Sequence, residues 1–271
     1  MKVIDLYRET KKKLEIAGIE EADAEARLIV AEGLGVGLGE LFLQGDRETE
    51  YDPAEILAKR TSGMPLAYAM RRKYFMGFPF YVDENVLIPR QDTEIVADEA
   101  LGLIRKNKYA TVLDLCCGSG CIGIALKKLA GVRALGCDIS PEAVQIANRN
   151  AKTLAAEGYR AIQSDLFENI NETFELIVCN PPYITDEEFE ALDEQVRDWE
   201  PKGALVGNLD FYIKIAAQAG AYLHPGGALV FEIGYSQKNA VHDILKQNNY
   251  QNIRCRKDLA GRDRVMVCTI N

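Results

Sequence analysis

The sequence predicts an α/β protein, with a mostly parallel sheet flanked by helices and a small helical domain in front of it. From about residue 110 onward, short apolar runs alternate with amphipathic helical patterns, as in parallel strands joined by crossover helices. Before that stretch, apolar residues recur at helical spacing. The predicted strands cover residues 111–115, 132–137, 160–163, 174–179, 228–233 and 265–270.

Residues 1–62 are expected to form the helical domain. Leu6 and Leu14, followed by Ala22, Ala26 and Ile29, recur at the intervals of helices that bury one face. The pattern then becomes aromatic and punctuated by turns, so residues 63–90 are expected to form a β-hairpin linker. Residues 91–271 are left for the α/β domain.

The composition is that of an ordinary soluble globular chain. Of the 271 residues, 48% are hydrophobic and 27% are charged, and no apolar run approaches the ~20 residues that span a bilayer. The seven cysteines lack a C-x-x-C pair, which favours reduced thiols in the cytoplasm over disulfides or a zinc site. The net charge of −9 argues against nucleic acid as the main partner, because phosphate binding needs a basic face. We therefore expect no metal, no membrane and no direct nucleic-acid contact.

A glycine-rich loop follows the first predicted strand. Gly118, Gly120 and Gly123 match the pattern G-x-G-x-x-G, which alone fits equally a turn that packs a strand against a helix. Asp114 stands at the end of the strand, where a carboxylate favours a cationic ligand over a pyrophosphate. A ligand with a sulfonium and an ammonium group therefore fits better than a dinucleotide. The candidate cofactor-binding residues of this region are Asp114, Cys116, Cys117, Gly118, Ser119 and Gly120.

Acidic residues also end the next two predicted strands. Asp138 lies 24 residues after Asp114, near the spacing of an acceptor for a ribose diol, and would serve NAD or S-adenosylmethionine equally well. A solvated aspartate at a strand end is the alternative. Asp165 could accept a hydrogen bond from an adenine amino group, with Leu166 or Phe167 against the ring, although an ordinary polar turn explains these residues as well.

Asn180-Pro181-Pro182-Tyr183 follows the apolar strand at residues 174–179. The Asn180 side-chain oxygen and the Pro181 carbonyl could accept the two hydrogens of a planar amino or amide group, because the prolines stiffen the loop and donate no N–H. Tyr183 could lie flat against such a group. Taken alone, the tetrapeptide is also an ordinary proline-rich turn. All these loops, however, fall at the ends of successive parallel strands, and packing alone does not explain that joint placement.

The chain resembles a class I S-adenosylmethionine-dependent methyltransferase in its loop at residues 114–120, in Asp138 and in Asn180-Pro181-Pro182-Tyr183. Three further stretches, at residues 63–68, 86–94 and 260–265, together with Glu232-Ile233-Gly234, are similar to the release factor glutamine methyltransferases of the HemK type. The resemblance covers nearly the whole chain. It implies a Rossmann-like fold with a seven-stranded, mostly parallel sheet, and a helical front domain that recognises the substrate.

The resemblance also implies the reaction. A methyl group would pass from S-adenosylmethionine to the side-chain amide nitrogen of the glutamine in the Gly-Gly-Gln motif of peptide chain release factors, the implied protein partners. The loop at residues 116–120 and Asp138 would hold the cofactor. Asn180 would contact both cofactor and glutamine and, with Pro181 and Tyr183, would act in catalysis. Pro182 would help to complete the glutamine pocket.

The sequence departs from the family pattern at three places. Cys116 stands where the first loop glycine is usual, and Arg71 stands where a glycine is common. The segment at residues 205–212 is shorter than the version typical of the family. These departures bear on local loop conformation more than on the reaction.

Three other function classes share part of these signals. A DNA or RNA amino-methyltransferase applies the same Asn-Pro-Pro-Tyr logic to a flipped base, but the acidity of the chain and its helical front domain count against it. An NAD-dependent oxidoreductase shares the glycine loop and Asp138, but that function does not explain residues 180–183. A non-catalytic binding module leaves the full set of site residues unexplained.

Overall fold

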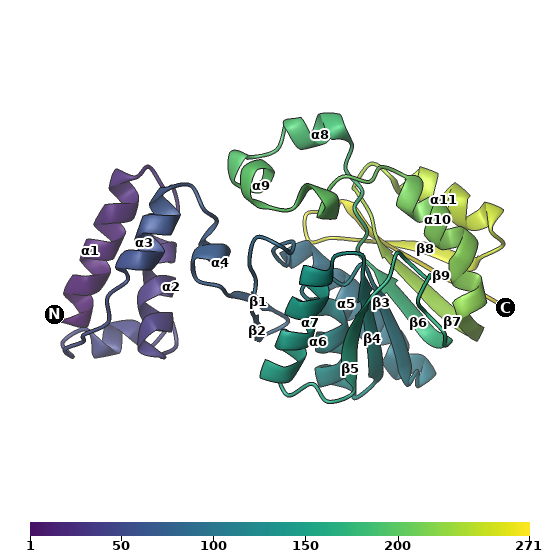
Figure 1. Cartoon of the computed structure of the whole chain (residues 1–271), viewed down its shortest axis with the longest axis horizontal. Coiled ribbons are helices and arrows are strands. Elements are labelled where there is room, and N and C mark those ends of the chain that lie inside the picture. Colours follow the sequence, from purple (N-terminus) through teal and green to yellow (C-terminus); the bar gives the residue numbers. More distant parts are fainter. The chain divides into compact units, whose positions relative to one another are not determined.

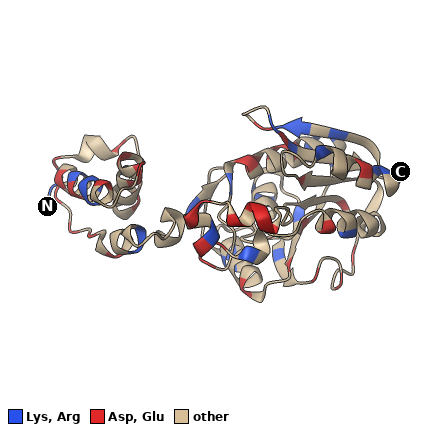
Figure 2. Cartoon of the chain, turned by 90° about the horizontal axis from the view of Figure 1, so that it is seen from above, with Lys and Arg blue, Asp and Glu red and all other residues tan.

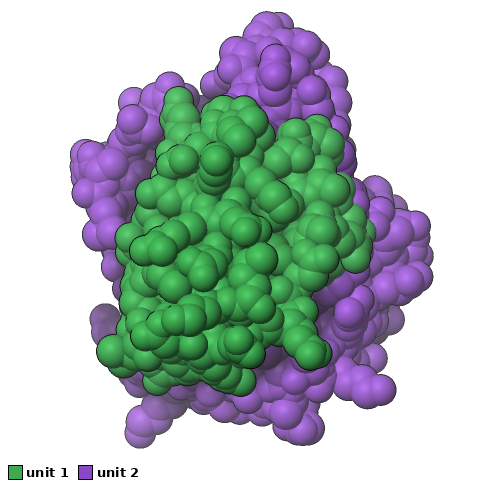
Figure 3. Space-filling view, turned by 90° about the vertical axis from the view of Figure 1, so that its left-hand side faces the viewer, with its two compact units in different colours: residues 1–71 green, residues 72–271 purple.

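The chain divides into two compact units between Arg71 and Arg72, in a computed structural model that describes all 271 residues. Unit 1 is Met1–Arg71 and unit 2 is Arg72–Asn271 (Figure 3). The predicted division into residues 1–62, 63–90 and 91–271 is finer, because it separates a linker from both domains, and it stays a prediction.

Unit 1 is helical, as predicted for the front of the chain. Its elements are α1 (Val3–Ile16), α2 (Ala22–Leu34), the 3-10 helix η1 (Leu41–Gln44), α3 (Ala54–Thr61) and α4 (Leu66–Ala69) (Figure 1). α1 packs against α2 and α3 around a core that includes Leu14, Ile29 and Val30. Gly33 allows Tyr51 to lie against α2, since a Cβ at position 33 would stand 2.0 Å from the Tyr51 ring.

Unit 2 begins with the β-hairpin that the aromatic stretch predicts. β1 (Lys73–Phe75) pairs antiparallel with β2 (Phe78–Phe80). Met76 and Gly77 form the turn with φ of 50° and 81°, the left-handed conformation that two-residue hairpin turns require. Phe75 and Phe80 are buried against the helices of unit 2, so the hairpin shares the core of this unit.

Seven strands form one sheet in the order β5-β4-β3-β6-β7-β9-β8. The first five in this order are parallel, and β9 runs antiparallel to both of its neighbours. The prediction of a seven-stranded, mostly parallel sheet is confirmed, although β8 was not located from the sequence and β7 begins earlier than expected. The strands are β3 (Thr111–Leu115), β4 (Arg133–Asp138), β5 (Tyr159–Gln163), β6 (Phe174–Cys179), β7 (Leu223–Glu232), β8 (Gln251–Lys257) and β9 (Asp263–Thr269).

Helices cover both faces of this sheet (Figure 1). One face packs against α5 (Gln91–Asn107), α6 (Cys121–Ala130) and α7 (Pro141–Thr153), and the other against α10 (Asp210–Ala219) and α11 (Lys238–Gln247). In β3, Val112 belongs to the first core and Leu113 to the second. A parallel strand buried on both faces reads as a continuous apolar run, which is why the sequence locates β3 correctly.

A helical segment between β6 and α10 is not part of either layer. It comprises α8 (Asp186–Glu190), α9 (Glu194–Trp199) and the short 3-10 helix η2 (Lys202–Ala204). A further 3-10 helix, η3 (Gly220–Tyr222), precedes β7.

Charged residues of both signs are mixed along the chain, as Figure 2 shows for Lys and Arg beside Asp and Glu. No helix combines the length and the apolar character that crossing a membrane requires.

Left-handed backbone explains where the chain departs from the family pattern. Arg71, Cys116 and Asn208 have φ of 54°, 57° and 50°. Glycine adopts this conformation freely, whereas another residue gives up about 1–2 kcal/mol. Arg71 and Cys116 therefore occupy positions whose backbone conformation favours glycine.

Candidate active site

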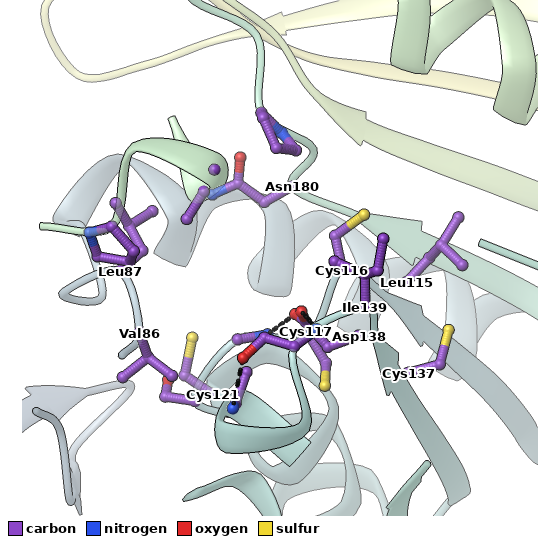
Figure 4. A pocket seen from close by; sticks show the side chains of 18 of the residues that line it. Val86, Leu87, Leu115, Cys116, Cys117, Cys121, Cys137, Asp138, Ile139 and Asn180 are labelled. Atoms are coloured by element: carbon purple, nitrogen blue, oxygen red, sulfur yellow. Dashed lines mark hydrogen bonds between the residues drawn. The ribbon is translucent and has the colours of Figure 1, made fainter. Parts of the chain in front are cut away.

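A cavity of about 330 Å³ lies at the carboxyl ends of β3, β4 and β6. The strand order reverses at this point, because β4 lies on one side of β3 and β6 on the other, and α/β sheets bind their ligands at such a crevice. Residues 84–90 and the η2 region add a wall from outside the sheet. Figure 4 shows Asn180 on one side of the cavity, and Asp138 with the glycine loop on the other.

Most of the predicted site residues meet at this cavity. Two groups can be distinguished by whether they contribute to its wall. The predicted residues that line it are Cys116, Cys117, Gly118, Ser119, Asp138, Asp165, Leu166, Asn180 and Pro182. Those that do not are Asp114, Gly120, Pro181 and Tyr183.

Asp138 holds the glycine loop against the end of β4. Its Oδ2 accepts the N–H of Gly118 at 2.8 Å, and its Oδ1 accepts the N–H of Ser140 at 3.0 Å, the bonds drawn in Figure 4. The N–H of Cys117 donates to the carbonyl of Cys137 at 3.0 Å. Burial raises the pKa of Asp138, while these backbone donors oppose that shift. Each carboxylate oxygen keeps a second lone pair for a ligand hydroxyl.

The glycines of the loop have different physical tasks. Gly118 has φ of 52°, and a Cβ built there meets no atom within 4 Å, so the loop at this point borders open space where a ligand can approach the backbone. At Gly120, with φ of 76°, a Cβ would stand 2.8 Å from the Tyr159 hydroxyl. Gly120 is therefore a packing glycine, and Gly118 forms the cradle. Because the backbone at Gly118 is open to a ligand, the cavity fits an extended cofactor.

Asp114 lies under the loop rather than on the cavity wall. Its Oδ2 accepts the N–H of Gly123 at 2.8 Å and the side chain is buried, so the contact predicted between this carboxylate and a cationic ligand stays a prediction. Its Oδ1 is buried without a hydrogen-bond partner. Burial raises the pKa of Asp114 to about 8, and the nearby Asp138 charge adds to this shift. Asp114 shapes the loop from below.

Asp165 and Leu166 lie in the loop after β5, on the wall of the cavity. Asp165 is exposed, and Leu166 is buried with φ of 47°. Ile139, which the sequence did not single out, lines the cavity while remaining 64% exposed. A flat apolar ligand group would cover such a side chain. The adenine contact predicted for Asp165 and Leu166 is compatible with this placement and stays a prediction.

Asn180 ends β6 at the edge of the cavity. Its Nδ2 donates to Oγ1 of Thr93 at 3.3 Å, while its Oδ1 accepts no hydrogen bond within the chain. The ring of Tyr183 does not reach the cavity, because its hydroxyl donates to Oε1 of the buried Glu232 at 3.2 Å. The direct roles predicted for Pro181 and Tyr183 therefore stay predictions, whereas Asn180 is placed to meet a ligand.

Residues from distant segments also contribute to the site. From the sequence, Arg90 could position the cofactor or tie the linker to the catalytic domain, whereas Thr93 and Glu200 were missed. Thr93 of α5 lines the cavity and donates to Oε2 of Glu232 at 2.6 Å. Arg90, also on the wall, pairs with the buried Glu200 at 2.5 Å, and Glu200 accepts the N–H of Ile88 at 3.1 Å. Glu232 stands in one stretch that carries the family resemblance, and Arg90 and Thr93 stand in another, residues 86–94. Nothing in the local sequence around Glu200 marks it.

Comparison with known proteins identifies the family to which the chain belongs. Residues 5–70 match the family described as PrmC N-terminal domain, and residues 99–198 match the Methyltransferase small domain. Release factor glutamine methyltransferase from Clostridium acetobutylicum is 39% identical over 241 residues, which cover 84% of this chain and 85% of that protein. The enzyme of the same name from Geobacter sulfurreducens is 37% identical over 268 residues, covering 95% and 93%. The chain belongs to the release factor glutamine methyltransferase family.

Solved structures agree with this fold. A methyltransferase from Pyrococcus furiosus superposes with a TM-score of 0.55 over 78% of this chain and 98% of that one, at 14% identity. Similarity at that level shows the fold alone. Together with family membership, it confirms the predicted class I methyltransferase fold and S-adenosylmethionine as the cofactor.

The methyltransferase site offers hydrogen-bond acceptors rather than a strong base. Asp138 provides carboxylate oxygens on one side of the cavity, and Asn180 provides an amide oxygen on another. Such a site can hold a cationic cofactor and orient a weakly nucleophilic nitrogen. Methyl transfer from a sulfonium needs alignment more than proton abstraction, so these groups match the chemistry.

Proposed function

We propose that this methyltransferase transfers the methyl group of S-adenosylmethionine to the side-chain amide nitrogen of the glutamine in the Gly-Gly-Gln motif of peptide chain release factors. The family supports this acceptor, since relatives that are called release factor glutamine methyltransferase match nearly the whole chain. The observation that carries the proposal is Asn180, whose amide oxygen remains free at the edge of the cavity.

Residues of the loops after β3, β4 and β5 would hold the cofactor. Asp138 would accept from the ribose hydroxyls, Gly118 would let the ligand approach the backbone, and Leu166 would contact the adenine, with Asp165 as acceptor for its amino group. S-adenosylmethionine, when bound, supplies a methyl group on a positively charged sulfur, which is a good electrophile. Cys116, Cys117 and Ser119 would complete this wall.

Asn180 and Pro181 would act on the glutamine amide. Its nitrogen is a poor nucleophile because the lone pair is delocalised. The Asn180 side-chain oxygen and the Pro181 carbonyl would accept its two hydrogens, which orients the nitrogen and favours the positive charge that develops as the new bond forms. Pro182 and Tyr183 would shape and stiffen the pocket around them.

Transfer of a labelled methyl group tests this function. A release factor and its variant with the tip glutamine replaced are incubated with the enzyme and labelled S-adenosylmethionine. We expect label only in the protein that retains the glutamine, and an Asn180→Ala enzyme that is about 100-fold slower, or about 3 kcal/mol, the cost of one preorganised polar contact. Equal labelling of the two release factors would refute glutamine as the acceptor.

The helical front domain is proposed to recognise the release factor, with residues 63–90 as a linker to residues 91–271, in a cytoplasmic enzyme. Three exposed apolar residues in one short segment of unit 1 support this assignment, because Leu38, Phe42 and Leu43 expose 52%, 45% and 86% of their surface and a group of exposed apolar residues is typical of a binding surface. A Leu43→Asp variant should raise KM for the release factor and leave KM for S-adenosylmethionine unchanged. An unchanged KM for the release factor would remove this residue from the recognition surface.

A further inference from the structure

A line of buried hydrogen bonds leads from Asn180 away from the cavity. Asn180 Nδ2 donates to Thr93 Oγ1 at 3.3 Å, and Thr93 Oγ1 donates to Glu232 Oε2 at 2.6 Å. Tyr183 donates to the other oxygen of Glu232 at 3.2 Å. Thr93 is 3% exposed and Glu232 is 1% exposed, so water does not compete for these bonds. The line connects three segments of the chain that are far apart in sequence.

The direction of these bonds is fixed by the number of hydrogens. An ionised carboxylate only accepts, and a threonine hydroxyl has a single hydrogen to give. Because that hydrogen goes to Glu232, the oxygen of Thr93 can only accept from Asn180. The amide of Asn180 must therefore turn its NH₂ group toward Thr93. Its carbonyl oxygen is left for the cavity, where it accepts no hydrogen bond within the chain.

We propose that Thr93 and Glu232 are positioning residues that decide which end of the Asn180 amide meets the substrate. The inference rests on the proposed function, in which Asn180 accepts a hydrogen from the glutamine amide. Without the hydroxyl and its acceptor, the Asn180 amide is free to turn over. The turned amide presents its own N–H groups to the N–H groups of the substrate, and donors that face each other make no hydrogen bond.

The surroundings of Glu232 keep this arrangement in place. Burial raises the pKa of Glu232, and the Thr93 hydroxyl, the Arg264 guanidinium and the Tyr183 hydroxyl each oppose that shift. Arg264 is itself held by Asp258 at 3.2 Å. Two hydroxyl donors and a guanidinium nearby are what a buried carboxylate needs to remain an acceptor.

Matched substitutions at position 93 test the proposal. Thr93→Val keeps the shape and removes the hydroxyl, whereas Thr93→Ser keeps the hydroxyl. We expect Thr93→Val to lower kcat at least tenfold while the Kd for S-adenosylmethionine, measured by calorimetry, changes less than twofold. Thr93→Ser should restore kcat to within threefold of the wild type. Equal kcat for the valine and serine variants would overturn the proposal.

A double substitution separates positioning from general stability. If Thr93 acts through Asn180, Thr93→Val should cause no further loss of kcat in an Asn180→Ala enzyme. A further tenfold loss in that background would assign Thr93 another role and contradict the proposal. If Asn180→Ala alone keeps full turnover, the proposed function of Asn180 fails. If Asn180→Ala is slow and Thr93→Val is as fast as the wild type, only the positioning role fails.

A measurement without turnover addresses the amide itself. In ¹⁵N-labelled enzyme, one Nδ2 hydrogen of Asn180 is bonded to Thr93 and should exchange slowly with solvent. We expect exchange at least tenfold faster in Thr93→Val, and near the wild-type rate in Thr93→Ser. Exchange that is equally slow in all variants would show that the amide is held by something else and would overturn the proposal.

Discussion

Replacing the buried Asp114 by asparagine should change how the stability of the fold depends on pH. Asp114 Oδ2 accepts the N–H of Gly123 at 2.8 Å, while Oδ1 is buried without a partner. Burial raises its pKa from an ordinary 3.8 to about 8. Between these two values the folded protein keeps a proton that the unfolded chain has released. Ionisation therefore opposes folding increasingly as the pH rises, and stability falls.

The size of the effect follows from that window. A proton held only by the folded state changes the free energy of unfolding by about 1.4 kcal/mol per pH unit. Asp114→Asn keeps an acceptor for Gly123 and does not titrate. Its amide hydrogens lack a partner, which costs about 1–3 kcal/mol at every pH and shifts the whole curve without tilting it. The slope is therefore the diagnostic quantity.

Urea unfolding at pH 5, 6 and 7 measures this slope. We expect the wild type to lose about 2.7 kcal/mol relative to Asp114→Asn between pH 5 and pH 7. Glu187→Gln, an exposed change on α8, serves as the control and should run parallel to the wild type. A constant difference between wild type and Asp114→Asn across this range would refute the reasoning, because it would mean that the folded state holds no extra proton there.

Four further substitutions test the cavity and the loop beside it. Asp138→Ala should weaken S-adenosylmethionine binding about 10- to 100-fold by calorimetry, the loss of a charged hydrogen bond, and unchanged affinity would remove it from the site. Gly120→Ala should lower the free energy of unfolding, measured in urea, by about 2 kcal/mol, because its Cβ would stand 2.8 Å from the buried Tyr159 hydroxyl. Gly118→Ala should lower it less, because a Cβ at position 118 meets no atom within 4 Å. Arg90→Ala leaves Glu200 buried without its charge partner and should cost about 3 kcal/mol, and a variant as stable as the wild type would contradict that pairing.

The sequence predicted the strands best where the strand is buried on both faces of the sheet. β3 and β6 were located to the residue because both are short, mostly apolar runs that lead into loop residues, Gly118 after the first and Asn180-Pro181 after the second. β8 was missed because Arg254 and Arg256 give an edge strand the composition of a solvated surface. The strand predicted at residues 228–233 is shorter than β7, because the first half of β7 contains Pro225 and Gly226 and pairs irregularly with β6.

The candidate site was only partly predictable for a related reason. Asp138 and Asn180 end strands, and the rule that parallel strands share one edge brings them to one cavity without further information. Thr93 and Glu232 meet although 139 residues separate them, and no local pattern records such a contact. The position of Asp114 under the loop was not predictable, because the spacing of a strand end does not show whether a side chain turns into the cavity or away from it.

The cysteines around the cavity have a consequence for chemical selectivity. Cys117, Cys121 and Cys137 line a site whose cofactor carries an electrophilic methyl group. A thiolate is a far better nucleophile than an amide nitrogen, but a thiol is not. Burial raises the pKa of all three thiols above the ordinary value, so they stay protonated. The burial that shapes this side of the cavity thus also makes these three thiols poor acceptors for the methyl group.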